Sequence, residues 1–103
     1  EAISRYDLKV AFEAESDLEI VDGYVGAGYA LSQPDELKLI THVCRREGLV
    51  LDPVYTGKAF HGMLQEIARG RFEGCRDIVF LHTGGIFGLF PKALEIAPLL
   101  KRK

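Results

Sequence analysis

The sequence DIVFLHTGG, residues 77–85, contains the strongest strand signal in the chain. Residues 78–81 form a continuous apolar run, which is typical of a strand buried on both faces of a parallel sheet. His82 and a Thr-Gly-Gly turn follow this run directly. Because open α/β sheets bind ligands beyond the carboxyl ends of their strands, this turn is a candidate ligand site.

Helical patterns alternate with short apolar stretches along the rest of the chain. Helices are predicted over residues 2–15, 33–47, 56–69, 86–90 and 92–100, and short strands over residues 18–21 and 49–51. Ser32 is the expected N-cap of the second helix, and Gly48 and Gly70 are the expected stops of the second and third. This alternation predicts an α/β fold in which a parallel sheet is flanked by helices in three layers.

Composition excludes several classes of protein. The chain has 103 residues, of which 48% are apolar and 27% charged, and its net charge is −2, so it should form one small globular domain without a nucleic-acid partner. No apolar run approaches the length of about 20 residues that spans a bilayer, and no signal peptide opens the sequence, which leads us to expect a cytoplasmic protein. Cys44 and Cys75 lack metal-type spacing and His42 and His61 share no helix, so no metal site is predicted.

A second turn with the same character is DPVYTGK, residues 52–58, which follows the strand candidate 49–51. Like the turn after residue 81, it places hydroxyl groups and glycines before a helix start, where free N–H groups and the helix dipole suit an anionic ligand. Simpler interpretations exist. Thr56 could be a plain helix cap, residues 83–85 a plain turn, His82 a structural residue, and Lys58 a solvated side chain.

A glycine-rich loop, GYVGAGY, occupies residues 23–29. Three glycines and two tyrosines in seven residues suit close approach of backbone and aromatic groups to another surface. We expect a contact for the hydroxyl group of Tyr24 and another for that of Tyr29.

These three motifs, DPVYTGKA at residues 52–59, FLHTGG at 80–85 and YVGAGY at 24–29, resemble the D-cysteine desulfhydrase and 1-aminocyclopropane-1-carboxylate deaminase family. They occur in the family's order and at similar separations, and they cover most of residues 20–90. The resemblance implies the tryptophan-synthase-β-like fold and the cofactor pyridoxal 5'-phosphate. It also implies a small amino acid as substrate and a homodimer as the assembly.

The resemblance also implies roles for individual residues. Tyr29 and Tyr55 are expected to be catalytic, facing the substrate side of the cofactor. Thr56, Thr83 and Gly84 are expected to bind the cofactor, with Thr83 at or beside the pyridine nitrogen and Gly84 permitting close approach of the backbone.

The residue after Tyr55 favours one reaction within the family. Deaminases that open the cyclopropane ring resemble one another in having Glu there, and this chain has Thr56. A carboxylate near the pyridine nitrogen strengthens the cofactor as an electron sink, whereas a hydroxyl group leaves it weaker, which suffices for expelling a good leaving group such as thiolate. We therefore expect β-elimination from D-cysteine to pyruvate, hydrogen sulfide and ammonia. The alternatives are 1-aminocyclopropane-1-carboxylate deamination, cysteate sulfo-lyase activity, or a non-catalytic ligand-binding or interaction module.

One family element does not occur in this sequence. The resemblance places the Schiff-base lysine in an N-terminal Asn-Lys motif, which is absent here, and Lys58 does not match it. Residues 1–103 are therefore expected to be the C-terminal part of the larger, cofactor-binding α/β domain. The isolated chain is expected to be inactive, with the remainder of its own polypeptide as a partner.

Overall fold

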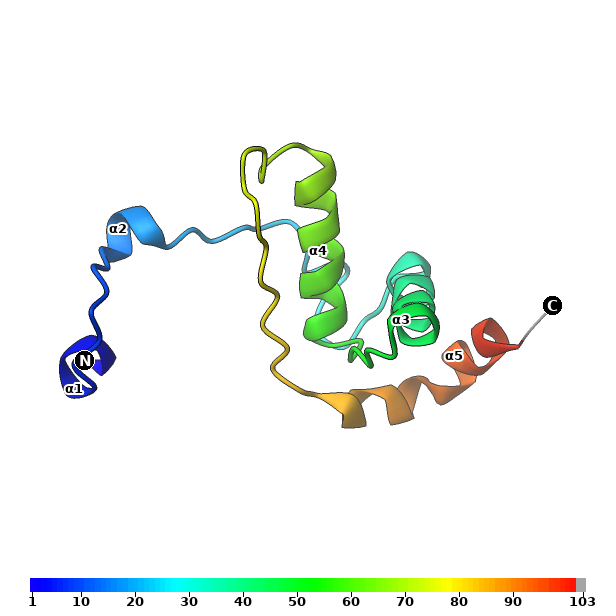
Figure 1. The fold of residues 1–103 in the computed structure, drawn as a ribbon. Coiled ribbons are helices and arrows are strands. Elements are labelled where there is room, and N and C mark those ends of the chain that lie inside the picture. Colours follow the sequence, from blue (N-terminus) through cyan, green and yellow to red (C-terminus); the bar gives the residue numbers. More distant parts are fainter. Residues whose placement is uncertain (102–103) are drawn as a thin grey trace.

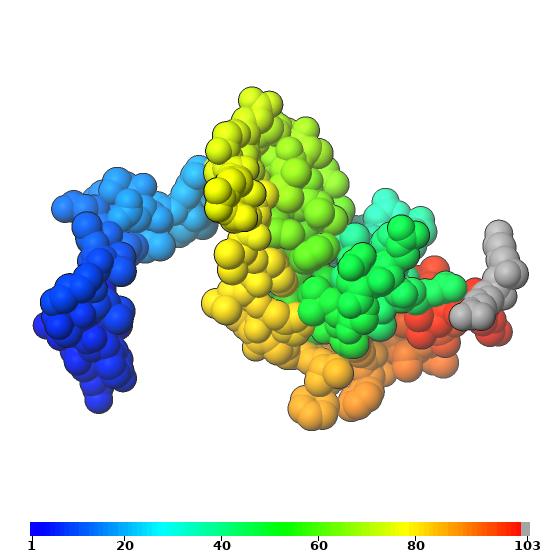
Figure 2. All heavy atoms as spheres, in the orientation of Figure 1, coloured from blue at the N-terminus to red at the C-terminus, as the bar shows by residue number. Residues whose placement is uncertain are grey.

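The computed structural model describes residues 1–101, and its two long helices form the centre of the molecule (Figure 1). These are α3 (Pro34–Glu47) and α4 (Thr56–Ala68), which pack against each other. The 3-10 helix η1 (Ile86–Lys92) continues into α5 (Ala93–Leu100), and α5 packs against α3. Two single-turn helices, α1 (Ala2–Arg5) and α2 (Ala14–Asp17), lie on an arm that extends away from this centre (Figure 2).

Five apolar side chains are buried in the core, and most of them come from α3. Its residues Leu37, Ile40 and Val43 recur at helical spacing and pack with Leu51 and with Ile96 of α5. Gly57 lets α4 approach this group, because a Cβ atom there would lie 2.6 Å from the Ile40 side chain and 2.6 Å from the Asp52 carbonyl oxygen. The core therefore joins α3, α5 and the start of α4.

The predicted helices 33–47 and 56–69 are confirmed to within one residue at each end, but the N-cap of α3 was predicted wrongly. Gln33, and not Ser32, is the N-cap, and it forms a capping box in which its backbone N–H donates to the Glu36 carboxylate at 2.8 Å. Ser32 instead donates to the Pro53 carbonyl oxygen. Gly48 ends α3 in the left-handed region at φ +68°, as expected for a glycine stop.

The predicted single helix over residues 2–15 was wrong. Only Ala2–Arg5 and Ala14–Asp17 are helical, and neither turn has a buried residue. Short helices are marginal without a tertiary surface to cover their apolar face, and this arm has none among the described residues. The periodicity of its apolar residues is real, but nothing buries them here.

The sheet is the largest difference from the sequence-based prediction. Among residues 1–101 no strand forms, and the expected strands 18–21, 49–51 and 78–81 are extended or irregular chain. Val79 and Leu81 are 90% and 78% exposed, although the apolar run predicted burial on both faces. A strand exists only when its N–H and C=O groups pair with a neighbour, and the described residues supply no such neighbour. The predicted three-layer sheet is therefore not seen among residues 1–101.

Candidate active site

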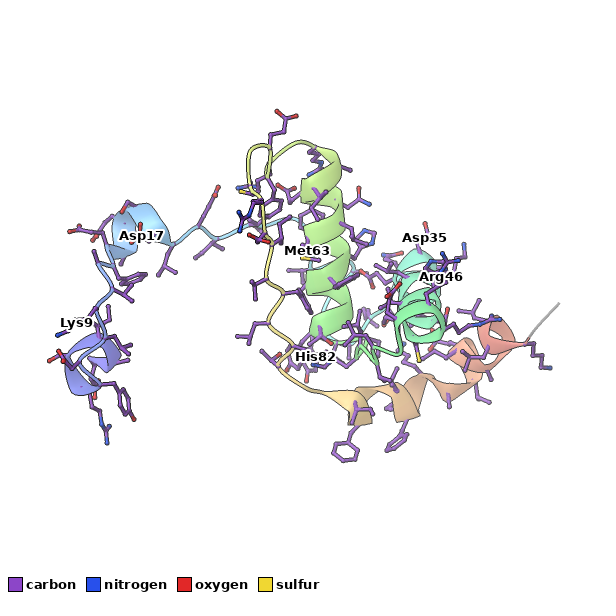
Figure 3. All side chains as sticks on the ribbon, in the orientation of Figure 1. Lys9, Asp17, Asp35, Arg46, Met63 and His82 are labelled. Carbon is purple, nitrogen blue, oxygen red and sulfur yellow. The ribbon has the colours of Figure 1, made fainter. Side chains whose placement is uncertain are left out.

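The two turns singled out in the sequence lie against each other. His82 Nε2 lies 2.9 Å from the Val50 carbonyl oxygen, and the Gly85 backbone is so close to Asp52 that a Cβ atom would lie 2.7 Å from the carboxylate carbon. Gly88 likewise lies beside Val54. In Figure 3 His82 marks the point where the extended segment after α4 bends toward η1. The chain thus brings residues 50–56 and 82–88 together, as the motifs predicted.

Asp52 organises the first turn, and the sequence analysis missed it. Its Oδ1 accepts the N–H groups of Val54 and Tyr55, each at 2.8 Å, and its Oδ2 accepts the N–H and hydroxyl of Thr56 at 2.8 and 2.6 Å. Burial alone would raise the pKa of Asp52, but the hydrogen bonds from Thr56, Tyr55 and Val54 together lower it. The signal was available, because an Asp three or four residues before a helix start is well placed to accept its free N–H groups.

Thr56 is held away from the cavity described below. It is buried, its hydroxyl group donates to Asp52 Oδ2, and its Oγ1 accepts the Asp52 N–H at 2.9 Å. It is the first residue of α4, and the N-cap position itself belongs to Tyr55, whose side chain makes no capping bond. The structure therefore gives Thr56 a clear part in shaping the turn.

The second turn is open. Thr83 and Gly84 are exposed, and a Cβ atom at Gly84, whose φ is +95°, would meet nothing within 4 Å. His82 holds this turn through both ring nitrogens, because Nδ1 accepts the Gly84 N–H at 3.0 Å while Nε2 faces the Val50 carbonyl oxygen. That arrangement requires a neutral ring with its proton on Nε2. The interpretation of His82 as a structural residue is confirmed.

The two predicted catalytic tyrosines meet. The Tyr55 hydroxyl group donates to that of Tyr29 at 3.3 Å, and the rings meet edge to face with centroids 6.1 Å apart. The hydrogen bond from Tyr55 and the nearby Tyr29 phenol raise the pKa of Tyr55. Both side chains are largely exposed, at 75% for Tyr29 and 60% for Tyr55.

The glycine-rich loop of residues 23–29 is called the tyrosine loop below. A cavity of about 700 Å³ lies between this loop and one face of α4. The helix contributes a stripe at helical spacing that includes Lys58, Ala59, Gly62, Met63 and Glu66. The rest of the lining comes from the loop, the first turn and one aromatic residue beyond α4: Val21, Asp22, Tyr24, Val25, Gly28, Tyr29, Val54, Tyr55 and Phe72. Its size is within the range of small-molecule sites, about 300–1,000 Å³. Thr56, Thr83 and Gly84 are not part of this lining.

The far end of the cavity is closed by a charged cluster. Tyr24 donates to Glu66 Oε1 at 2.5 Å, Arg69 donates to both groups, and Arg71 pairs with Glu66 and with Glu19. The hydrogen bonds from Tyr24 and Arg71 lower the pKa of Glu66 to about 2. The expected contacts for the hydroxyl groups of Tyr24 and Tyr29 are both confirmed.

Lys58 is a second residue whose environment differs from the prediction. It was taken as a solvated side chain, yet it is only 7% exposed and its ammonium donates to the carbonyl oxygens of Val25 and Gly28 at 2.6 and 2.8 Å. The apolar residues Leu64 and Ile67 of α4 remain 37% and 41% exposed. The helix buries its polar and glycine face against the tyrosine loop.

This donor set fits a flat aromatic ligand with an attached amino acid. The cavity offers a wide apolar surface, and its lining includes the phenol groups of Tyr29 and Tyr55. The glycine turn at residues 83–85 lies outside this lining, and a Cβ atom at Gly84 would meet nothing within 4 Å. Among residues 1–101 no group of three potential metal ligands occurs, and no helix is long and apolar enough to cross a membrane.

Comparison with known proteins assigns the chain to a family. Residues 6–84 match the family described as pyridoxal-phosphate dependent enzyme, and the chain belongs to that family. This family has the tryptophan-synthase-β-like fold and uses pyridoxal 5'-phosphate. No solved structure matches the chain.

Individual relatives cover most of this chain. It is 40% identical over 94 residues to a putative 1-aminocyclopropane-1-carboxylate deaminase of Thermotoga maritima, which is 91% of the chain and 28% of the relative. It is 40% identical over 86 residues to a bifunctional mitochondrial D-cysteine desulfhydrase/1-aminocyclopropane-1-carboxylate deaminase of Arabidopsis thaliana, 82% of the chain and 21% of the relative. It is 37% identical over 82 residues to a D-cysteine desulfhydrase of Salmonella typhi, 80% of the chain and 25% of the relative. The chain thus spans about a quarter of the length of the relatives it matches.

Proposed function

We propose that this chain forms one wall of the active site of a pyridoxal-phosphate-dependent lyase that breaks down a small amino acid. The observation that carries the proposal is the Tyr29–Tyr55 hydroxyl pair at the mouth of the cavity, beside the packed turns 50–56 and 82–88. The preferred reaction converts D-cysteine and water to pyruvate, hydrogen sulfide and ammonia. The relatives support both this reaction and its alternative, since their names include D-cysteine desulfhydrase and 1-aminocyclopropane-1-carboxylate deaminase.

The two tyrosines would move a proton at the substrate. Bound pyridoxal phosphate supplies an electron sink for charge that develops next to the substrate's amino group. A tyrosine phenol carries its proton at neutral pH, and the direction of the Tyr55 pKa shift, which is upward, keeps it so; Tyr55 would therefore begin the reaction protonated. Tyr55 donates to the Tyr29 oxygen, which leaves the Tyr29 O–H free to point into the cavity. Tyr29 would then protonate the sulfur as it leaves with the electrons of the carbon–sulfur bond, and Tyr55 would return a proton to Tyr29. Because Tyr55 is 60% exposed, water would return a proton to it, and a base in the rest of the polypeptide would take the proton from the substrate's Cα.

We also propose that Thr56, Thr83 and Gly84 bind the cofactor. Thr83 and Gly84 are exposed and can approach a pyridine ring from the open turn. Thr56 would act next to the ring, and its hydroxyl group would have to leave Asp52 Oδ2 to contact the ring directly.

The rest of the architecture follows from the same proposal. Residues 1–103 would be the C-terminal part of the larger cofactor-binding domain, with the lysine that carries the cofactor elsewhere in the polypeptide. Segments 49–51 and 78–81 would then be strands of a parallel sheet completed by that remainder, which would bury the exposed Val79 and Leu81. We also propose a cytoplasmic homodimer.

The test is a ratio of two activities measured on the complete protein. Hydrogen sulfide release from D-cysteine should greatly exceed ammonia release from 1-aminocyclopropane-1-carboxylate. The reverse ratio would assign the deaminase reaction instead, and the absence of both activities would leave a non-catalytic module.

A companion variant tests the position after Tyr55. Thr56→Glu should raise ring opening relative to hydrogen sulfide release if this residue sets the electron demand of the cofactor. Because a glutamate there would face the Asp52 carboxylate, Thr56→Gln is the matched control for the change in size. If Thr56→Glu and Thr56→Gln gave the same ratio of the two activities, the charge at this position would not determine which reaction is preferred.

A further inference from the structure

Lys58 is placed where a lysine is unfavourable unless it has a specific partner. It is the third residue of α4, and the start of a helix carries partial positive charge that repels a cation. Its side chain is also buried, which disfavours an ammonium group further. Among residues 1–101 it forms no ion pair within 4 Å. The hydrogen bonds that stabilise the Lys58 ammonium group are those that it donates to two backbone carbonyl oxygens.

Those two oxygens belong to the tyrosine loop. Val25 and Gly28 direct their carbonyl groups at the Lys58 ammonium from 33 and 30 residues earlier in the chain. Gly26 lies between them at φ +70°, and a Cβ atom there would lie 3.3 Å from Glu36 Oε1 and 3.7 Å from Lys58 Nζ. The loop backbone is thus enclosed by an ammonium group on α4 and a carboxylate on α3.

The bond to Gly28 fixes the residue immediately before Tyr29. Tyr29 itself is 75% exposed, so packing alone does little to hold its ring. Its partner Tyr55 is the N-cap residue of α4, three positions before Lys58 on the same turn. Lys58 therefore attaches Tyr29 to the element that carries Tyr55.

We propose that Lys58 is a positioning residue that sets the distance between the Tyr29 and Tyr55 hydroxyl groups. This inference rests on the proposed function, because it gives the lysine a part in the same proton transfer. Lys58 touches neither hydroxyl group, so it acts through the backbone of residues 25–28. A displacement of about 1 Å at a reacting group can cost two orders of magnitude in rate.

The experiment uses the complete protein carrying Lys58→Met, with Lys38→Met as the matched control. Lys38 lies on the exposed face of α3, where its side chain is 63% exposed and pairs with Asp35. In Lys58→Met we expect kcat to fall by about 10- to 100-fold while bound cofactor, read by its visible absorbance, is retained. The amides of residues 25–29 should exchange with solvent faster, and those of α3 should not. Lys38→Met should change none of these quantities.

A double-mutant cycle with Tyr29→Phe separates positioning from a general effect. If Lys58 acts through Tyr29, the double variant should be no slower than Tyr29→Phe alone. Two rate losses that multiply, or unchanged exchange at residues 25–29, would overturn the proposal. If Lys58→Met does not fold, the same cycle is run with Lys58→Arg, which keeps the charge and the donors but changes their geometry.

The exchange measurement also separates this inference from the proposed function. Unaltered protein that releases neither hydrogen sulfide nor ammonia would refute the lyase assignment. Faster exchange at residues 25–29 in Lys58→Met would still establish that the lysine holds the loop. Unchanged exchange would refute that claim whatever the activity.

Discussion

At the scale of single residues, the Tyr55 hydroxyl group is the most direct test of the site. Tyr55→Phe removes one oxygen and leaves the ring that packs against Tyr29. If this phenol relays protons, turnover by the complete protein should fall by roughly 100-fold or more, while the absorbance of the bound cofactor persists. Tyr6→Phe, on the N-terminal arm, is the control. A rate equal to that of the unaltered protein would take Tyr55 out of the chemistry.

Asp52 should contribute more to stability than its single charge suggests. Asp52→Ala leaves three backbone N–H groups and the Thr56 hydroxyl without their acceptor at a buried site. We expect a loss of about 2–4 kcal/mol in the free energy of unfolding, measured by urea titration of the complete protein. Asp52→Asn keeps one carbonyl oxygen and should lose less. Equal losses in the two variants would show that the second oxygen contributes nothing.

The same carboxylate predicts a direction for pH dependence. Its pKa is lower in the folded state than in the unfolded state, so its stabilising contribution is fully present above the unfolded value of 3.8. The contribution is lost as the pH falls below 3.8 and through the lower folded value. Unfolding midpoints measured between pH 6 and pH 3 should therefore converge for the unaltered protein and Asp52→Ala at the acid end. A difference that stays constant with pH would mean that the charge of Asp52 is not what stabilises the turn.

At the scale of elements, two glycines of α4 determine how closely its neighbours α3 and the tyrosine loop can pack against it. A methyl group at Gly57 would lie 2.6 Å from the Asp52 carbonyl oxygen and from Ile40, whereas one at Gly62 would lie 3.0 Å from the Tyr24 ring, which belongs to a loop. Gly57→Ala should therefore destabilise the complete protein by about 1–3 kcal/mol through overpacking. Gly62→Ala should cost less, because the loop can move and alanine favours the helix by up to about 1 kcal/mol. Thermal unfolding of both variants checks the ranking, and the opposite order would contradict the packing described for α3 and α4.

Prediction from sequence succeeded where an element is stabilised by its own residues. Helix α3 has a proline and two acidic residues in its first turn, an apolar face and a glycine stop, and all of these act locally. The catalytic roles of Tyr29 and Tyr55 come from resemblance and stay a prediction, and the contact between their hydroxyl groups was not predicted. Lys58 was missed as a structural residue because its partners, the carbonyl groups of Val25 and Gly28, lie about 30 residues earlier in the chain and meet it only in three dimensions. Asp52 could have been found, because the groups that it accepts from lie two to four residues after it. The expected strand 78–81 failed for a related reason, since pairing depends on residues outside the segment.

At the scale of the whole molecule, the chain is far from a self-sufficient globule. Its radius of gyration is 16.5 Å, against about 13 Å for a compact domain of this length. Its buried apolar core has five residues, and the arm that carries α1 and α2 buries none. Most of the apolar surface of residues 1–21 and 78–94 is left to solvent, including Ile20, Val79 and Leu94, which are each at least 90% exposed.

This architecture predicts how the isolated chain behaves. Residues 1–103 expressed alone should bind a hydrophobic dye and should be cleaved by protease first between residues 6 and 22, before α3 and α4. The complete protein should protect the same segment, because covering its apolar residues requires further surface. Mass spectrometry of early digestion products gives the order of cleavage. Early cuts inside α3 would show that the core described here does not hold without that surface.

The tyrosine loop is fastened to one helix at both of its ends. Lys58 holds it at the first turn of α4, and Tyr24 holds it at the last turn through Glu66 and Arg69. The tyrosine loop and α4 should therefore move together as one rigid unit, and any movement of α4 should displace the Tyr29 and Tyr55 phenols by the same amount. The stripe between the two fastenings, at Ala59 and Met63, can then vary in bulk without moving the hydroxyl groups. Substitutions at these two positions would therefore change which substrate side chains fit the cavity without moving the hydroxyl groups of Tyr29 and Tyr55.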